Sequence, residues 1–118
     1  MAEDAQQILQ RALIGEALDC AEGTAVFVWN EERHYVAVNE EACRLVGLSR
    51  AELVGMPVGD LSPDRAAPEI ELVRRSPLVR GTSTFTRRGG ETVAVEWVTM
   101  QTRVAGLGYM VSLVWPAR

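Results

Sequence analysis

Apolar side chains near the start of the chain recur at intervals of three and four, so they fall on one face of a helix: Ala5, Ile8, Leu9, Ala12, Leu13 and Ala17. Asp4 is a candidate N-cap. An amphipathic helix of this length is stable only when its apolar face packs on something else. The pattern therefore predicts a helix over residues 4–19 that covers its own sheet or pairs with a second chain. Residues 1–20 would form this N-terminal element, and residues 21–118 one further domain.

Five segments have the composition and the alternation of β-strands. Two of them, residues 24–29 and 34–38, are separated by a short polar turn. The other three, residues 82–87, 92–103 and 109–115, follow one another with glycine-containing turns between them. Strands that are joined by short turns pair antiparallel. The sequence therefore predicts one antiparallel sheet built from an initial hairpin and a final three-stranded meander.

Helix signals fill the segment between these two groups of strands. Asn39 is placed to cap a helix over residues 40–46, and Ser49 with Glu52 forms a capping box for a second helix over residues 50–54. The expected order of elements is β-β-α-α-α-β-β-β, which is an α+β fold.

The third of these helices is expected over residues 64–75, where Pro68 predicts a kink. Before it, Gly55, Pro57 and Gly59 are expected to break the chain.

Composition removes several classes of function. The 118 residues carry a net charge of −4, so a nucleic-acid partner, which needs a basic face, is not expected. No apolar run approaches the roughly 18–20 residues that span a bilayer, which predicts no membrane insertion. The polar start of the chain is unlike a signal peptide, and we expect a cytoplasmic protein.

Candidate reactive residues are few. Cys20 and Cys43 are two reduced thiols in a cytosolic protein or, alternatively, a disulfide or redox pair. His34 is the only histidine, so histidine and cysteine cannot assemble a metal site at ligand spacing. There is no nucleophile elbow, P-loop or metal motif, and no catalytic residue is predicted. We do not expect an enzyme.

The order and spacing of several motifs resemble the PAS family of sensory domains. The family pattern of an asparagine, a glycine and then S-x-x-E-L-x-G is matched in step by Asn39, Gly47, Ser49, Glu52, Leu53 and Gly55. Arg88-Gly89-Gly90-Glu91 resembles the family's R-x-D-G hairpin, with Gly89 where aspartate is common, and Val95-Glu96 matches a frequent pair in the next strand. The resemblance runs from about residue 22 to residue 115.

This resemblance implies a five-stranded antiparallel sheet with helices over one face and a cavity between them. It also implies a regulatory input to an effector domain or partner protein, and a homodimer formed through the N-terminal helix and the outer face of the sheet. The chain departs from the family at its end, where Val114-Trp115-Pro116 replaces the frequent Asp-Ile-Thr that couples to an output helix. Coupling would then use another route, or the effector lies outside this chain.

Alternation along the strands, aligned with the flavin-binding subgroup of PAS domains, assigns the cavity face. The candidates for lining it are Phe27, Trp29, Leu45, Leu53, Leu61, Ile70, Val73, Ser83, Phe85, Val95, Trp97, Met110, Ser112 and Val114. We expect these residues either to form a filled core or to bind an apolar molecule such as a fatty acid or an aromatic metabolite. Arg65, Arg74 and Arg75 are candidates for a carboxylate head group, or are simply solvated.

Two familiar cofactors are not expected. The flavin subgroup has polar amides where this chain has Phe85, Val95 and Val114, and its photoactive cysteine corresponds to Val58. Apolar residues there would leave the polar edge of the flavin unsatisfied, at about 1–3 kcal/mol per group. Haem is held in the family by a histidine of the third helix, and residues 64–75 contain none.

The outer face of the last strand is also apolar, although a strand open to water would alternate with polar residues. An uncovered patch of this kind is an interaction site. The predicted dimer interface combines it with the N-terminal helix: Ile8, Leu9, Ala12, Leu13, Tyr109, Val111, Leu113 and Trp115. The alternative within the same fold is a purely structural dimerisation domain with a filled core and no ligand.

Overall fold

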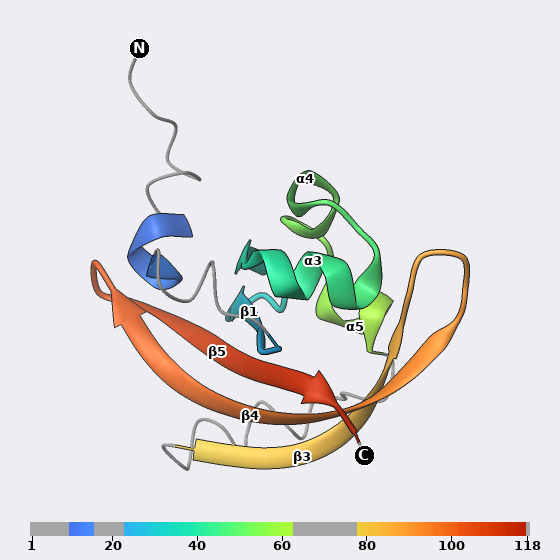
Figure 1. Ribbon diagram of the computed structural model, residues 1–118. Coiled ribbons are helices and arrows are strands. Elements are labelled where there is room, and N and C mark those ends of the chain that lie inside the picture. The colour runs from blue at the N-terminus through green and yellow to red at the C-terminus, as the bar shows by residue number, and fades with distance from the viewer. Residues whose placement is uncertain (1–9, 16–22, 63–77, 118) are drawn as a thin grey trace.

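The structure, a computed structural model, describes residues 10–15, 23–62 and 78–117 (Figure 1). Five strands form one antiparallel sheet in the order β2-β1-β5-β4-β3. Their bounds are Ala25–Asn30 for β1, Tyr35–Val38 for β2, Leu78–Thr86 for β3, Thr92–Val104 for β4 and Leu107–Pro116 for β5. The predicted five-stranded antiparallel sheet is therefore confirmed.

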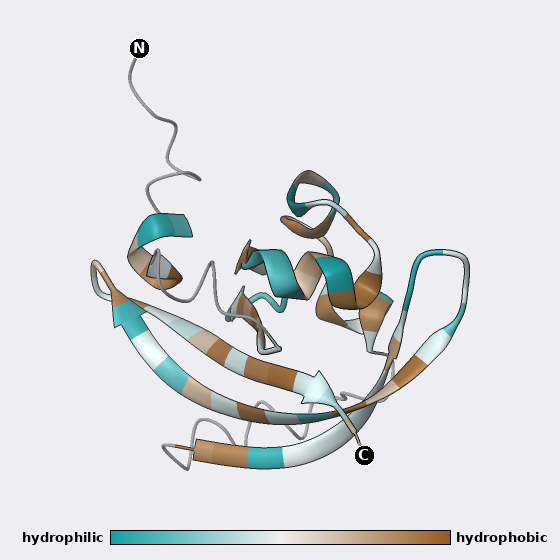
Figure 2. Ribbon diagram, viewed as in Figure 1, coloured by the Kyte–Doolittle hydropathy of each residue, from teal (hydrophilic) through white to brown (hydrophobic). Residues whose placement is uncertain are grey.

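Three short helices lie against one face of the sheet, which curves around them (Figure 1). They are α3 (Glu40–Val46), α4 (Arg50–Leu53) and α5 (Val58–Leu61). We call the face beneath them the inner face and the opposite one the outer face. The hydrophobic residues concentrate where these helices meet the sheet and through the middle of β5 (Figure 2). This layering is that of the predicted α+β fold.

Asn39 joins the first hairpin to the helices. Its side-chain oxygen accepts from the backbone N–H of Val26 and of Ala42, both at 2.9 Å, and its amide nitrogen donates to the carbonyl of Thr24 at 3.0 Å. The residue has no exposed surface. One side chain therefore caps α3, as predicted, and its hydrogen bond with Val26 also holds the start of α3 against β1.

The capping box of α4 is present, with Ser49 accepting from the Glu52 N–H and Glu52 accepting from the Ser49 N–H, both at 3.1 Å. Arg88, in the β3–β4 turn, donates to the Gly47 carbonyl at 2.7 Å and forms an ion pair with Glu52. The backbone N–H of Ser49 and then the Arg88 side chain lower the pKa of Glu52 from its ordinary value of 4.5. The capping box and the Arg88 hairpin, two of the motifs shared with the family pattern, thus lie in contact.

The open edge of β2 is covered over much of its length. The side-chain amide of Gln10 accepts from the Val38 N–H at 3.2 Å and donates to the Val38 carbonyl at 2.6 Å. Arg50 donates to the same carbonyl at 3.1 Å. Further along, Tyr35 exchanges backbone hydrogen bonds with Gly55 and Met56. These contacts occupy backbone groups that would otherwise be free to pair with another strand.

The predicted N-terminal helix is described only over residues 10–15, of which 10–13 are helical and Gly15 has a left-handed φ of 74°. The other residues of that helix, including Ile8 and Leu9, lie outside the described part. So does the predicted helix over residues 64–75, with Ile70, Val73 and the three candidate arginines. Within the described part, Ile14 packs on the outer face of its own sheet.

Two expectations about the elements are wrong. Strand β3 begins at Leu78 and not at residue 82, because its first four residues pair with Trp97–Met100 of β4 despite Gly81. Gly59, expected to break the chain, instead lies inside α5, whose Val58 and Leu61 are buried in the core. In both places, tertiary packing outweighs the local preference of glycine and proline.

Candidate functional site

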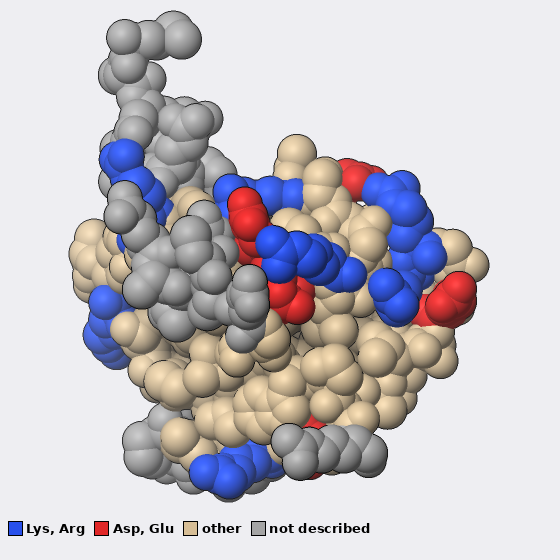
Figure 3. Space-filling view, viewed as in Figure 1, with Lys and Arg blue, Asp and Glu red and all other residues tan. Residues whose placement is uncertain are grey.

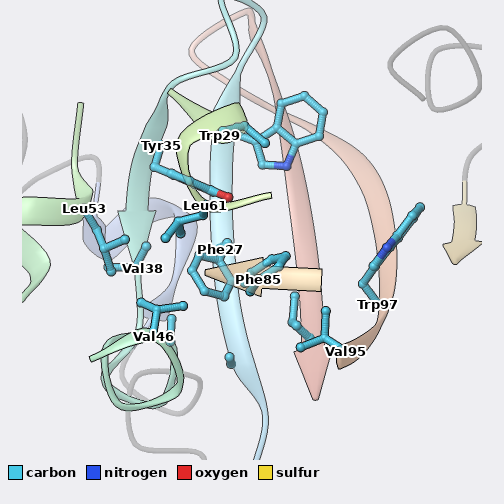
Figure 4. Packing of buried hydrophobic residues seen from close by; sticks show 14 of the residues in the cluster. Phe27, Trp29, Tyr35, Val38, Val46, Leu53, Leu61, Phe85, Val95 and Trp97 are labelled. Carbon is cyan, nitrogen blue, oxygen red and sulfur yellow. The ribbon is translucent and has the colours of Figure 1, made fainter. Parts of the chain in front are cut away.

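The inner face carries the larger of two hydrophobic clusters. At its centre Phe27 of β1 contacts Phe85 of β3 edge to face and Tyr35 of β2 at a tilt, with ring centroids 5.4 Å apart in both pairs. Val46, Leu53 and other apolar side chains close over these rings from the helices (Figure 4). This half of the inner face is a packed core, and its aromatic contacts add about 0.5–1.5 kcal/mol per pair beyond burial.

Trp29 and Trp97 lie to the other side of this centre, over β5 and β4 (Figure 4). Trp29 donates its indole N–H to the Ser112 hydroxyl at 3.2 Å, and the Thr99 hydroxyl lies 2.7 Å from the same Ser112 oxygen. Ser112 and Thr99 have no exposed surface. The polar atoms of this group are therefore paired with one another, as burial requires.

Trp97 is held in a different way. Its indole N–H donates to the Ser83 hydroxyl at 2.9 Å, and its ring lies on Gly81, the residue opposite it in β3. A Cβ built on Gly81 would lie 2.4 Å from Cζ2 of the indole. The glycine thus leaves room for the Trp97 ring to approach the β3 backbone beside Ser83.

Most of the predicted lining residues come together on this face. The described ones that are buried in the inner cluster or bonded to it are Phe27, Trp29, Leu53, Leu61, Ser83, Phe85, Val95, Trp97, Met110, Ser112 and Val114. Leu45 is only half-buried at the edge of the cluster, because α3 turns Ala42 and Val46 inward instead. Val58, Phe85, Val95 and Val114, the positions that bear on flavin, are all buried apolar side chains.

Sequence reasoning missed several residues of this face, among them Tyr35 and Val46 of the core and Thr99 and Gly81 beside the tryptophans. Thr99 shares the alternation of Val95 and Trp97 along β4, so its face could have been predicted. Gly81 could not, because its role depends on the pairing of β3 with β4, and the strand was expected to start one residue after it.

The outer face carries the second cluster, in which Ile14 packs with Val26, Val28, Ala37 and Tyr109. Tyr109 has only 7% of its surface exposed, so little of it is free for the predicted interface. The remaining described candidates are accessible: Leu13, Val111, Leu113 and Trp115 are half-buried, and Ala12 is exposed.

Trp115 donates its indole N–H to Glu96 at 3.0 Å on this outer face. On the side shown in Figure 3, charged atoms gather around α3 and the β3–β4 turn, while the strip over β5 and β4 is mostly uncharged. Among the described residues, no group of three or more histidine, cysteine, aspartate or glutamate side chains could hold a metal ion. Nor does the described part contain a helix of the length and apolar content that crossing a membrane requires.

Comparisons with known proteins agree with this architecture. The sequence profile described as "PAS domain" matches residues 23–111. No curated protein matches the chain. Among solved structures, the chain is similar to a PAS domain from a two-component sensor histidine kinase, with a TM-score of 0.81, 19% identity and coverage of 94% of this chain and 99% of that one.

Two further structures show the same fold. One is the PAS domain of an HTR-like protein from Haloarcula marismortui, with a TM-score of 0.76, 16% identity and coverage of 95% and 96%. The other is a domain of a sensory box sensor histidine kinase/response regulator from Geobacter sulfurreducens, with a TM-score of 0.72, 23% identity and coverage of 93% of both chains.

Proposed function

Because the chain belongs to the PAS domain family, we propose that it is a sensory and signalling module that regulates an effector carried elsewhere. The supporting observation is the family match over residues 23–111. Similar structures from sensor histidine kinases favour the same role. Two properties would let such a module work, namely a homodimeric contact and a cavity that responds to a ligand, and each can be tested separately.

The outer face supports the proposed homodimer. Val98 and Met100 of β4 lie beside Leu113 and Val111 of β5 in the sheet register, and all four are half-buried. Burying apolar surface contributes about 25 cal/mol per Å², so a second copy placed here would gain free energy without new polar contacts. The N-terminal segment would extend this surface beyond Ile14.

Sedimentation of Leu113→Glu tests the dimer. We expect the variant to sediment as a monomer, because a carboxylate in the middle of the apolar surface would have to be buried unpaired. Thr92→Glu, at an exposed outer-face position of β4 opposite Thr86, is the matched control and should keep the parent mass. A wild-type monomer, or an unchanged mass for Leu113→Glu, would refute a dimer through this face.

The inner face supports the proposed binding of a small apolar molecule beside Trp97. Both indole N–H groups are already bonded to hydroxyls, so the rings offer apolar faces in preference to donors. A fatty acid or an aromatic metabolite fits that chemistry, whereas a flavin would find Phe85, Val95 and Val114 at its polar edge. The alternative remains a purely structural domain with these side chains as filler.

Native mass spectrometry distinguishes a ligand-binding domain from a purely structural one, provided that the same sample is then denatured and extracted. A bound ligand would add a few hundred daltons that disappear on denaturation, and Trp97→Ala should lower its occupancy. If the wild-type protein carries no added mass and Trp97→Ala only lowers stability, the domain is purely structural and its core is filled by its own side chains. In that case the cost should be about 3–5 kcal/mol.

A further inference from the structure

A groove lies at the end of the sheet where the β1–β2 turn meets the start of β5. It is lined by residues of β1, the turn, β2 and β5, namely Asn30, Glu31, Glu32, Val36, Leu107, Gly108 and Tyr109. Its volume is about 300 Å³. That is the lower limit for small-molecule sites, which hold drug-sized ligands at about 300–1,000 Å³. The groove therefore has room for one long side chain and not for a large cofactor.

Two carboxylates of this groove have no ion-pair partner in the part of the chain that the structure describes. Glu31 and Glu32 are exposed, and neither forms a hydrogen bond or an ion pair through its side chain within the described residues. Glu31 leans across Gly108, so that its Oε1 lies 3.2 Å from where a Cβ of residue 108 would be. Arg103, opposite Gly108 in the sheet, instead donates to the Gly106 carbonyl at 3.2 Å.

The other wall of the groove is apolar and aromatic. Leu107 has 61% of its surface exposed, more than any other large hydrophobic residue described. Tyr109 also lines the groove, although only 7% of its surface is exposed. Its hydroxyl makes no hydrogen bond within the described residues and is not among the fully enclosed polar atoms. A phenol oxygen that is not enclosed and has no partner among these residues is a ready acceptor.

We propose that this groove binds an arginine side chain presented by another protein. A guanidinium offers five donors in one plane, which suits two carboxylates and a phenol oxygen, and it also stacks on aromatic rings. The alkyl stem would lie against Leu107 and Val36. An exposed leucine at the rim suits an apolar residue next to the arginine, which a partner protein provides and a free amine does not.

The test uses the full chain and a fluorescein-labelled hexapeptide that alternates leucine and arginine, followed by fluorescence anisotropy. Glu31→Gln/Glu32→Gln should weaken binding about tenfold, because charge-assisted hydrogen bonds to the guanidinium are lost. The matched control, Glu40→Gln/Glu41→Gln, removes two carboxylates from the exposed side of α3 and should change affinity less than about twofold. Gly108→Ala narrows the groove without a change of charge and should also weaken binding.

Amide chemical shifts of the labelled protein would locate the peptide, and we expect the largest changes at residues 30–36 and 107–109. Citrulline in place of arginine should abolish binding, since it keeps the shape and removes the charge.

Equal losses of affinity in the two double variants, or chemical-shift changes spread over the acidic surface, would show non-specific attraction and overturn the proposal. If free arginine amide bound as tightly as the peptide, the groove would be a site for a small molecule and not for a partner protein, which would overturn the proposal. A change of sedimentation mass in Glu31→Gln/Glu32→Gln would assign the groove to a second copy of this chain and also overturn it.

Discussion

The inner and outer faces of the sheet are built from alternate residues of the same strands, yet they differ in how completely they are covered. On β5, Ser112 and Val114 point inward and have no exposed surface, while Val111 and Leu113 point outward and remain half-buried. On the inner face, even the hydroxyls of Ser112 and Ser83 are used by indole N–H groups. The described strand residues of the inner face are therefore almost fully buried, whereas those of the outer face leave apolar surface accessible to a partner.

Truncation of the central ring should have the largest effect. Phe27→Ala removes a side chain with no exposed surface that contacts both Phe85 and Tyr35, and it should cost about 3–5 kcal/mol of unfolding free energy. Val111→Ala on the outer face should cost roughly 1 kcal/mol, because it leaves a smaller and open space. Urea unfolding of both variants measures the difference in stability, and similar losses would contradict a more deeply buried inner face.

Loss of the buried cap should come next. Asn39→Ala leaves two backbone N–H groups and one carbonyl without their partner, and each buried group left unsatisfied costs about 1–3 kcal/mol. We expect a total loss of about 2–4 kcal/mol, since Ala42 lies in a helical turn that can partly relax. Ser49→Ala, an exposed cap in the same layer of helices, should cost only about 0.5–1 kcal/mol.

The packing of the Trp97 ring can be disturbed by a substitution at Gly81, without a change to any aromatic residue. Gly81→Ala places a methyl group where the Trp97 ring lies, so the ring must move, at about 1–3 kcal/mol for overpacking. Loss of the bond to Ser83 should appear as a change in tryptophan emission. Gly59→Ala, where a Cβ meets nothing within 4 Å, is the control and should leave emission unchanged.

The smallest expected effect concerns the exposed ion pair at the rim. The lowered pKa of Glu52 means that the folded state holds the carboxylate charged more firmly than the unfolded state does. The resulting stabilisation is fully present above the ordinary value of 4.5 and is lost as the pH falls through the lower, folded-state pKa. Urea midpoints should therefore fall less steeply between pH of about 5 and about 3 in Glu52→Gln than in the wild-type protein. Parallel curves would contradict the assignment.

What the sequence determined by itself is the local architecture and the direction of the side chains. Asn39, Ser49 and Glu52 act as caps where they were predicted, because capping needs only residues within three or four positions. Alternation placed Phe85, Trp97 and Val114 on one face, since successive side chains of a strand point to opposite sides.

The tertiary structure alone decided which distant residues meet. Strand register puts Gly81 beneath Trp97, and the pairing of β1 with β5 brings the hydroxyl of Ser112 to an indole 83 positions away. Gln10 forms hydrogen bonds with Val38 at the edge of β2. The groove beside Tyr109 is formed jointly by the β1–β2 turn and the start of β5. Such contacts depend on the packing of whole elements, and the physical reason they escape sequence reasoning is that no local preference encodes the pairing of one strand with another.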